Sequence, residues 1–159
     1  MKILACLLPF SLVVTSQAAP YKDARYGFSI VPPAFAPGEA ESVTPVMFFA
    51  AGEKGFAANL NVAVQTTSMT AQEYAELSRG QFQQMGLKVH SEKELKVGGR
   101  NAFLWDYQGK TQGLDLHWLA LAVHDKGRVF LVTGTSTSEA FEKHEKAFRD
   151  ALTSFTLPE

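Results

Sequence analysis

The sequence predicts an α+β fold, with an antiparallel β-sheet of about six to seven strands and a helix packed on each face (a three-layer αβα sandwich). Two apolar segments, residues 114–123 and 129–132, are separated by a short turn at residues 125–127. Both segments are apolar at consecutive positions, as strands covered on both faces are, so we expect this hairpin in the middle of the sheet. Residues 136–155 then show the periodicity of an amphipathic helix that can cover one face.

Short strands and turns precede the first predicted helix. Residues 26–31 predict a strand that ends at two prolines, and residues 34–41 predict a loop because they contain a Pro-Gly pair. Residues 43–50 predict a second strand, and we expect it at a sheet edge because Pro45 cannot donate a ladder hydrogen bond. After a glycine-containing turn, residues 56–66 predict a third strand with alternating apolar and polar positions.

Residues 71–85 carry the clearest helix signal in the chain. Thr70 and Glu73 have the spacing of a capping box, in which each side chain bonds the other residue's backbone N–H. Gly86 is a natural C-terminal stop. The predicted buried stripe consists of Tyr74, Leu77, Phe82 and Met85.

Four strands and a helix should follow. Residues 88–97 are charged and predict an edge strand, and a Gly-Gly turn connects them to a strand at residues 101–108. Residues 109–113 predict a mobile loop before the central hairpin. The last helix can start from Ser136 or Ser138, since either hydroxyl can cap it. Its predicted buried stripe consists of Phe141, Phe148, Leu152 and Phe155.

Residues 1–18 have the features of a cleavable signal peptide. Lys2 is followed by the apolar residues 3–14 and then by a small-residue cleavage site. Cys6 raises the alternative of a lipoprotein, which we disfavour because cleavage before Cys6 would leave almost no apolar region ahead of it. We therefore expect residues 19–159 to form a single periplasmic domain that does not insert directly into a membrane after signal cleavage.

The charge balance excludes one class of partner. The chain has 15 Lys and Arg residues against 16 Asp and Glu residues, a net charge of −1, and no cluster of basic residues. Proteins that bind nucleic acid neutralise phosphates with basic patches, so we expect no nucleic acid partner.

Five residues are candidates for ligand binding. Asp115 and His117 lie two apart on a predicted strand, so they share a face and can pair; the simpler interpretation is a polar strand end. Trp105, Tyr107 and Trp118 either pack under a helix or line a half-open aromatic pocket between sheet and helix. The histidines show no metal-ligand spacing, so the sequence predicts no catalytic residue, no metal site and no cofactor.

Several short segments together form a recognisable pattern. They are Tyr26-Gly-Phe-Ser-Ile30 with the following prolines, Leu60-Asn-Val-Ala-Val64, Gln83-Gln-Met-Gly86, Leu95-Lys-Val-Gly-Gly-Arg100, Val129-Phe-Leu-Val-Thr-Gly-Thr135 and Ala151-Leu-Thr-Ser-Phe155. In its order and spacing this set resembles the PsbP/DcrB-like group of exported domains, and the resemblance covers essentially all of residues 19–159.

The resemblance implies the same three-layer sandwich and raises the expectation of a binding role. Together with the absence of a catalytic motif, it favours a non-enzymatic periplasmic accessory or adaptor protein that binds another envelope protein. The expected contact surfaces are the edge strand at residues 88–97 and the loops at residues 34–41 and 109–113. The alternative is a small-ligand-binding module that uses the aromatic pocket.

Overall fold

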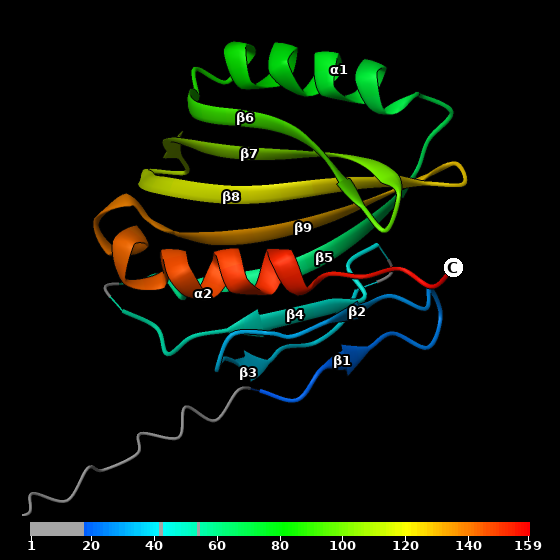
Figure 1. Cartoon of the computed structure of the whole chain (residues 1–159). Coiled ribbons are helices and arrows are strands. Elements are labelled where there is room, and N and C mark those ends of the chain that lie inside the picture. Colours follow the sequence, from blue (N-terminus) through cyan, green and yellow to red (C-terminus); the bar gives the residue numbers. More distant parts are fainter. Residues whose placement is uncertain (1–17, 42, 54) are drawn as a thin grey trace, which may run out of the picture.

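A seven-stranded antiparallel sheet and two helices dominate the part of the chain that the computed structural model describes, residues 18–41, 43–53 and 55–159 (Figure 1). The strands are β3 (Ala36–Pro37), β4 (Val46–Phe49), β5 (Asn59–Thr66), β6 (Lys88–Val97), β7 (Arg100–Thr111), β8 (Leu114–Asp125) and β9 (Arg128–Thr137). The helices are α1 (Ala71–Gln84) and α2 (Phe141–Ser154), and β1 (Tyr21–Lys22) pairs with β2 (Ser29–Ile30) in a separate small sheet. The α+β class and the antiparallel sheet are confirmed.

The order of strands across the sheet is β3-β4-β5-β9-β8-β7-β6. The predicted hairpin, β8 and β9, therefore lies in the middle, and the charged strand β6 lies at an edge as expected. The strand near Pro45 is not an edge strand, because β4 is paired on one side with β5 and on the other with the two-residue strand β3. The predicted loop at residues 34–41 was thus wrong at Ala36 and Pro37.

The two turns that connect β6 to β7 and β7 to β8 consist of residues with positive φ. Gly98 and Gly99 connect β6 to β7 with φ of 54° and 80°, as a two-residue turn of this kind requires. The mobile loop expected at residues 109–113 is instead mostly strand, because β7 continues to Thr111 and the turn consists only of Gln112 and Gly113. Both turn residues have positive φ, 51° and 80°. The β7–β8 hairpin is therefore long and regular.

Helix α1 starts and ends where the sequence indicates. Thr70 accepts a hydrogen bond from the Glu73 backbone N–H at 3.2 Å, and Glu73 accepts one from the Thr70 N–H at 2.7 Å, which confirms the capping box. Gly86, with φ of 65°, ends the helix. The predicted buried stripe was partly wrong, because Leu77 and Met85 are 44% and 60% exposed. The residues that α1 buries are Ala71, Ala75 and Ser78.

Helix α2 starts later than predicted. Ser136 is a fully buried residue of β9 and caps no helix. A short 3₁₀ turn, η1 (Ser138–Ala140), precedes α2, and the Thr137 side chain accepts a hydrogen bond from the Ala140 N–H. The predicted buried stripe of α2 is confirmed by Phe141, Phe148, Leu152 and Phe155, all at most 5% exposed.

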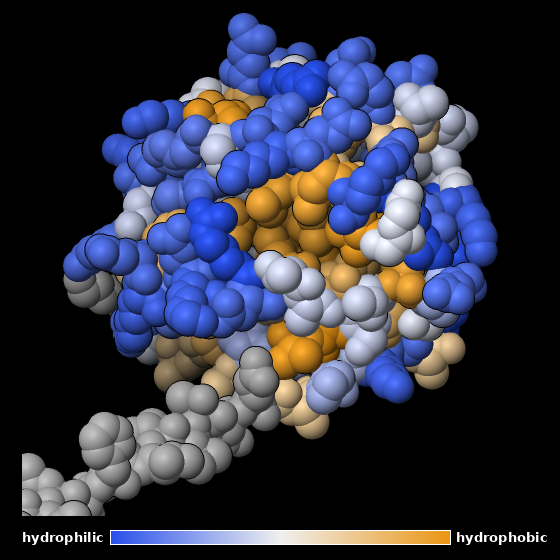
Figure 2. All heavy atoms as spheres, in the orientation of Figure 1, coloured by the Kyte–Doolittle hydropathy of each residue, from blue (hydrophilic) through white to orange (hydrophobic). Residues whose placement is uncertain are grey.

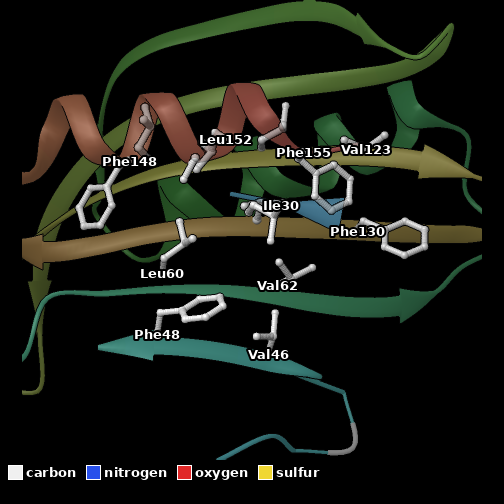
Figure 3. Close-up of a cluster of buried hydrophobic side chains, with 14 of the residues drawn as sticks. Ile30, Val46, Phe48, Leu60, Val62, Val123, Phe130, Phe148, Leu152 and Phe155 are labelled. Carbon is white, nitrogen blue, oxygen red and sulfur yellow. The ribbon is translucent and has the colours of Figure 1, made fainter. Parts of the chain in front are cut away.

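The larger hydrophobic cluster joins α2 to the central strands (Figure 3). Phe148 and Leu152 of α2 and Phe155 beyond it belong to one cluster with Phe130 of β9 and Val62 of β5. Each strand contributes alternate residues: Leu60, Val62 and Val64 from β5, Leu119, Leu121 and Val123 from β8, and Phe130 and Val132 from β9. Alternate residues on a strand point to the same side, so this cluster occupies one face of the sheet.

A second, smaller cluster joins α1 to the strand residues that point to the opposite face of the sheet. Ala71 and Ala75 of α1 pack with Phe103 and Trp105 of β7. Ala122 and Val129 complete the buried part of this cluster. Small residues of the helix face bulky aromatic residues of the strands, so the volumes of the two surfaces complement each other.

No helix in the described part of the chain is long and apolar enough to cross a membrane. The signal peptide predicted at residues 1–18 lies, except for its last residue, outside the described residues, and so does Cys6.

Candidate functional site

The structure divides the five candidate residues between two faces of the sheet. Tyr107 of β7 lies directly opposite Trp118 of β8, and Trp105 shares their face because it is two residues from Tyr107. Asp115 and His117 have the other parity and lie on the other face. The five residues therefore cannot form one site.

The three aromatic candidates lie in one group of contacting rings, in which Tyr107 and Trp118 are stacked and Trp105 meets the Phe82 ring edge-on at 5.9 Å. The Tyr107 ring lies 5.2 Å from the Trp118 ring at 17°, and 4.5 Å from the Phe82 ring of α1 at 28°. Trp105 is only 1% exposed, and its indole Nε1–H donates to Oε2 of Glu92 at 2.9 Å. Trp105 is thus a core residue with a satisfied polar group, whereas Tyr107 and Trp118 remain half-buried.

A cavity of about 280 Å³ lies between α1 and this aromatic surface. Its walls include Trp105, Tyr107 and Tyr74, whose hydroxyl donates to Oε1 of Gln65 at 3.1 Å. Burial, with a smaller contribution from Tyr74, raises the pKa of Tyr107 to about 12, and burial also raises the pKa of Tyr74. Both phenols are therefore neutral hydrogen-bonding groups near neutral pH.

Asp115 and His117 share a face but do not pair. Asp115 is exposed at the end of β8, and its Oδ1 accepts a hydrogen bond from Oγ of Ser138 at 2.8 Å. His117 instead has its Nε2 2.6 Å from Oδ1 of Asp106 on the neighbouring strand β7. The pair that the sequence allowed is therefore not formed, because each residue bonds a side chain on another element; Asp106 is the diagonal cross-strand neighbour of His117.

His117 belongs to a polar cluster that spans three strands. One ligand atom each from His90 of β6, Asp106 of β7 and His117 of β8 lie within 4.8 Å of one another. The β6–β7 register shifts between Val89 and Ser91, so His90 sits in a β-bulge. A bulge re-aims a side chain, and here the rings of His90 and His117 lie 5.3 Å apart at 29°.

Neighbouring groups hold this three-strand cluster in place. The His117 ring is stacked on Phe141 of α2 with 3.5 Å between centroids and 5° between planes. Nη2 of Arg149 donates to the other carboxylate oxygen of Asp106 at 3.1 Å. Asp106 is 9% exposed, and its two carboxylate oxygens are bonded by His117 and Arg149, as a buried polar group requires. The sequence carried no spacing signal for the cluster, and only the strand register and the bulge could have revealed it.

An apolar groove of about 540 Å³ lies between the second half of β6 and the end of α2. Figure 2 shows it as a hollow of hydrophobic residues near the C-terminal end of α2, surrounded by hydrophilic ones. Leu95, Leu104 and Leu157 are half-buried in its wall, while Leu121 and Leu152 are 3% and 4% exposed. Apolar hollows of this kind mark binding surfaces in many proteins.

Comparison with known proteins identifies a family. The sequence matches the DcrB family over residues 39–154, well over half of the chain. The effector EagT6 of Pseudomonas aeruginosa is 29% identical over 77 residues, which are 48% of this chain and 54% of that protein. The chain thus spans about half the length of this curated relative.

Solved structures share the fold at low sequence identity. A protein of unknown function from Pseudomonas aeruginosa, PA94, superposes with a TM-score of 0.66 at 18% identity, over 90% of this chain and 98% of that chain. The cyanobacterial PsbP of Synechocystis superposes with a TM-score of 0.65 at 15% identity, over 96% of this chain and 99% of that chain. LpqN, involved in cell envelope biogenesis of Mycobacterium tuberculosis, superposes with a TM-score of 0.65 at 12% identity, over 88% of this chain and 90% of that chain. At these identities, the likeness establishes the fold alone.

Proposed function

The chain belongs to the DcrB family, and on this basis we propose that it is a non-enzymatic accessory protein of the periplasm that binds another protein of the cell envelope. The observation that carries the proposal is the apolar groove beside the edge strand β6. The involvement of the fold neighbour LpqN in envelope biogenesis agrees with this compartment.

We propose that the functional unit is a single exported domain. Residues 1–18 are the signal peptide that is removed, and residues 19–159 form a three-layer αβα sandwich with α1 and α2 on opposite faces of the sheet. The membership of the two hydrophobic clusters supports this layering, because α1 packs on strand residues of one parity and α2 on those of the other.

The groove and the edge of β6 together suit an extended peptide segment. In the described sheet β6 pairs only with β7, so its outer edge offers backbone donors and acceptors to a further strand. The adjoining apolar wall, which includes Leu95 and Leu104, can take the partner's hydrophobic side chains. We therefore propose that the partner contributes an extended segment with apolar side chains.

The serines near the start of α2 do not support hydrolase chemistry. Ser136 is fully buried and its Oγ donates to the Thr137 carbonyl at 2.9 Å. Ser138 donates to Asp115 at 2.8 Å, so the hydroxyls of these two serines bond a carbonyl and a carboxylate, not a histidine. A serine nucleophile needs a base within hydrogen-bonding reach, so these hydroxyls fit structural roles.

Affinity capture after mild cross-linking in the native envelope tests the proposal. The Leu95→Glu variant places a charge in the groove wall, whereas Leu77→Glu places the same charge on α1, where the side chain is already 44% exposed. We expect a partner protein that is captured by the wild type and by Leu77→Glu and is lost with Leu95→Glu. Equal capture by the two variants would contradict the use of the groove.

The cavity under α1 favours a second candidate function, a small-ligand-binding module. Its volume of about 280 Å³ lies near the lower end of known ligand pockets, at roughly 300 Å³, so only a small molecule would fit. Trp105 and Tyr107 line it and would sense an occupant. A ligand should shift the emission of Trp105, and this shift should disappear in Trp105→Phe. Emission that no ligand class changes would count against this function.

A further inference from the structure

We propose that His90, Asp106 and His117 form a binding site for a divalent transition-metal ion of the zinc type. This site is independent of the proposed partner groove. Two imidazoles and one carboxylate are ligands that Zn²⁺ prefers, and three protein ligands leave a coordination position for water.

The distances agree with a small rearrangement on metal binding. Zinc bonds of about 2.0–2.2 Å in tetrahedral geometry place ligand atoms roughly 3.3–3.6 Å apart. The three ligand atoms already lie within 4.8 Å of one another, and the His117 Nε2–Asp106 Oδ1 distance of 2.6 Å has only to widen. His90 is exposed on the edge strand, so rotation of its side chain can supply the remaining movement.

The surroundings prepare each ligand for this role. Arg149 binds Oδ2 of Asp106 at 3.1 Å and so leaves Oδ1 directed toward His117. The guanidinium charge is itself balanced by Glu145, 2.7 Å away, which reduces its repulsion of a cation. The His117 ring plane is fixed by the parallel ring of Phe141. Partners of this kind orient metal ligands in known sites.

The polar contacts within the cluster define which hydrogen bonds a metal would replace. Nε2 of His117 lies 2.6 Å from Oδ1 of Asp106, and when this nitrogen binds the metal, the proton of the neutral imidazole is carried by Nδ1. Nε2 of His90 lies 2.9 Å from Oε1 of the Gln108 side chain, and this hydrogen bond is exchanged for the metal or kept if Nδ1 coordinates.

Isothermal titration of the purified, tag-free protein with Zn²⁺ tests the site. We expect one ion per chain, and His90→Ala and His117→Ala should each weaken binding by at least the roughly 10- to 100-fold that loss of an outer-shell partner causes. His144→Ala is the matched control, because His144 contacts Phe35 and Phe148 outside the cluster. X-ray absorption should show imidazole nitrogens together with oxygen around the zinc.

His90 is exposed, so its replacement keeps the test valid even if His117→Ala fails to fold. The proposal is overturned if the wild type binds no zinc, or if His90→Ala binds it as tightly as the wild type and the His144→Ala control. Absorption spectra without imidazole ligands would overturn it equally.

Discussion

Replacing Gly134 by alanine should destabilise the protein, because Gly134 provides the space that lets α2 pack on β9. A Cβ at this position would lie 2.5 Å, 2.6 Å and 2.9 Å from three atoms of the Phe148 ring. That ring is 0% exposed and meets the rings of Phe35, Phe141 and His144 at centroid distances of 6.1, 6.3 and 5.9 Å. The ring therefore has little room to move away.

The expected magnitude follows from two opposing effects. Overpacking a core typically costs about 1–3 kcal/mol, whereas removing a strand glycine gains about 0.5–1 kcal/mol. We expect Gly134→Ala to lower the free energy of unfolding by about 1–2 kcal/mol. Urea unfolding followed by circular dichroism measures this as a lower midpoint at unchanged slope.

Gly80→Ala provides the control with the opposite sign. Gly80 lies inside α1, and a Cβ there would meet no heavy atom within 4 Å. The same substitution should therefore raise the free energy of unfolding by about 0.5–1 kcal/mol through the higher helix propensity of alanine. A Gly134→Ala variant as stable as the wild type would refute the close packing of Phe148 on β9.

Two further predictions concern the pH dependence of stability. The pKa of Tyr107 is raised to about 12 by burial, so its contribution to stability is complete below the ordinary value of 10.0 and is lost as the pH rises toward 12; Tyr107→Phe should remove this alkaline loss in unfolding titrations. The pKa of Glu92 is lowered, chiefly by its hydrogen bond from Arg79, so its contribution is present above pH 4.5 and is lost as the pH falls through the lowered pKa. Arg79→Ala should weaken this acid dependence, and an identical acid profile for wild type and variant would contradict the pairing.

Local signals in the sequence predicted the elements well. Thr70, Glu73 and Gly86 fixed both ends of α1 because caps act through neighbouring backbone groups. The apolar pattern of β8 and β9 placed them in the centre because central strands need cover on both faces.

Features that depend on packing between elements were not predictable in the same way. Leu77 was expected inside and is exposed, because α1 turns its small residues Ala71 and Ala75 toward the bulky Phe103 and Trp105. Hydrophobicity alone cannot express this complementarity of volume.

In the candidate sites, too, local patterns were predictable from the sequence and contacts between strands were not. The sequence grouped Trp105 and Tyr107 in one aromatic set, and both lie on the same face of the sheet because they are two residues apart on β7. The cluster of His90, Asp106 and His117 was missed because it depends on the register of three strands and on a bulge. A bulge changes which side of the strand a residue faces, and no spacing along the chain reports it.

The most direct test of partner binding is site-specific photocross-linking in the living envelope. A photoreactive residue is placed at Lys96 or Thr153, which are exposed at the groove, and at Glu76 of α1 as the control. If the groove binds an envelope protein, the two groove positions yield an adduct with the same protein and Glu76 yields none. Adducts only at Glu76, or none at either groove position, would contradict the proposed function.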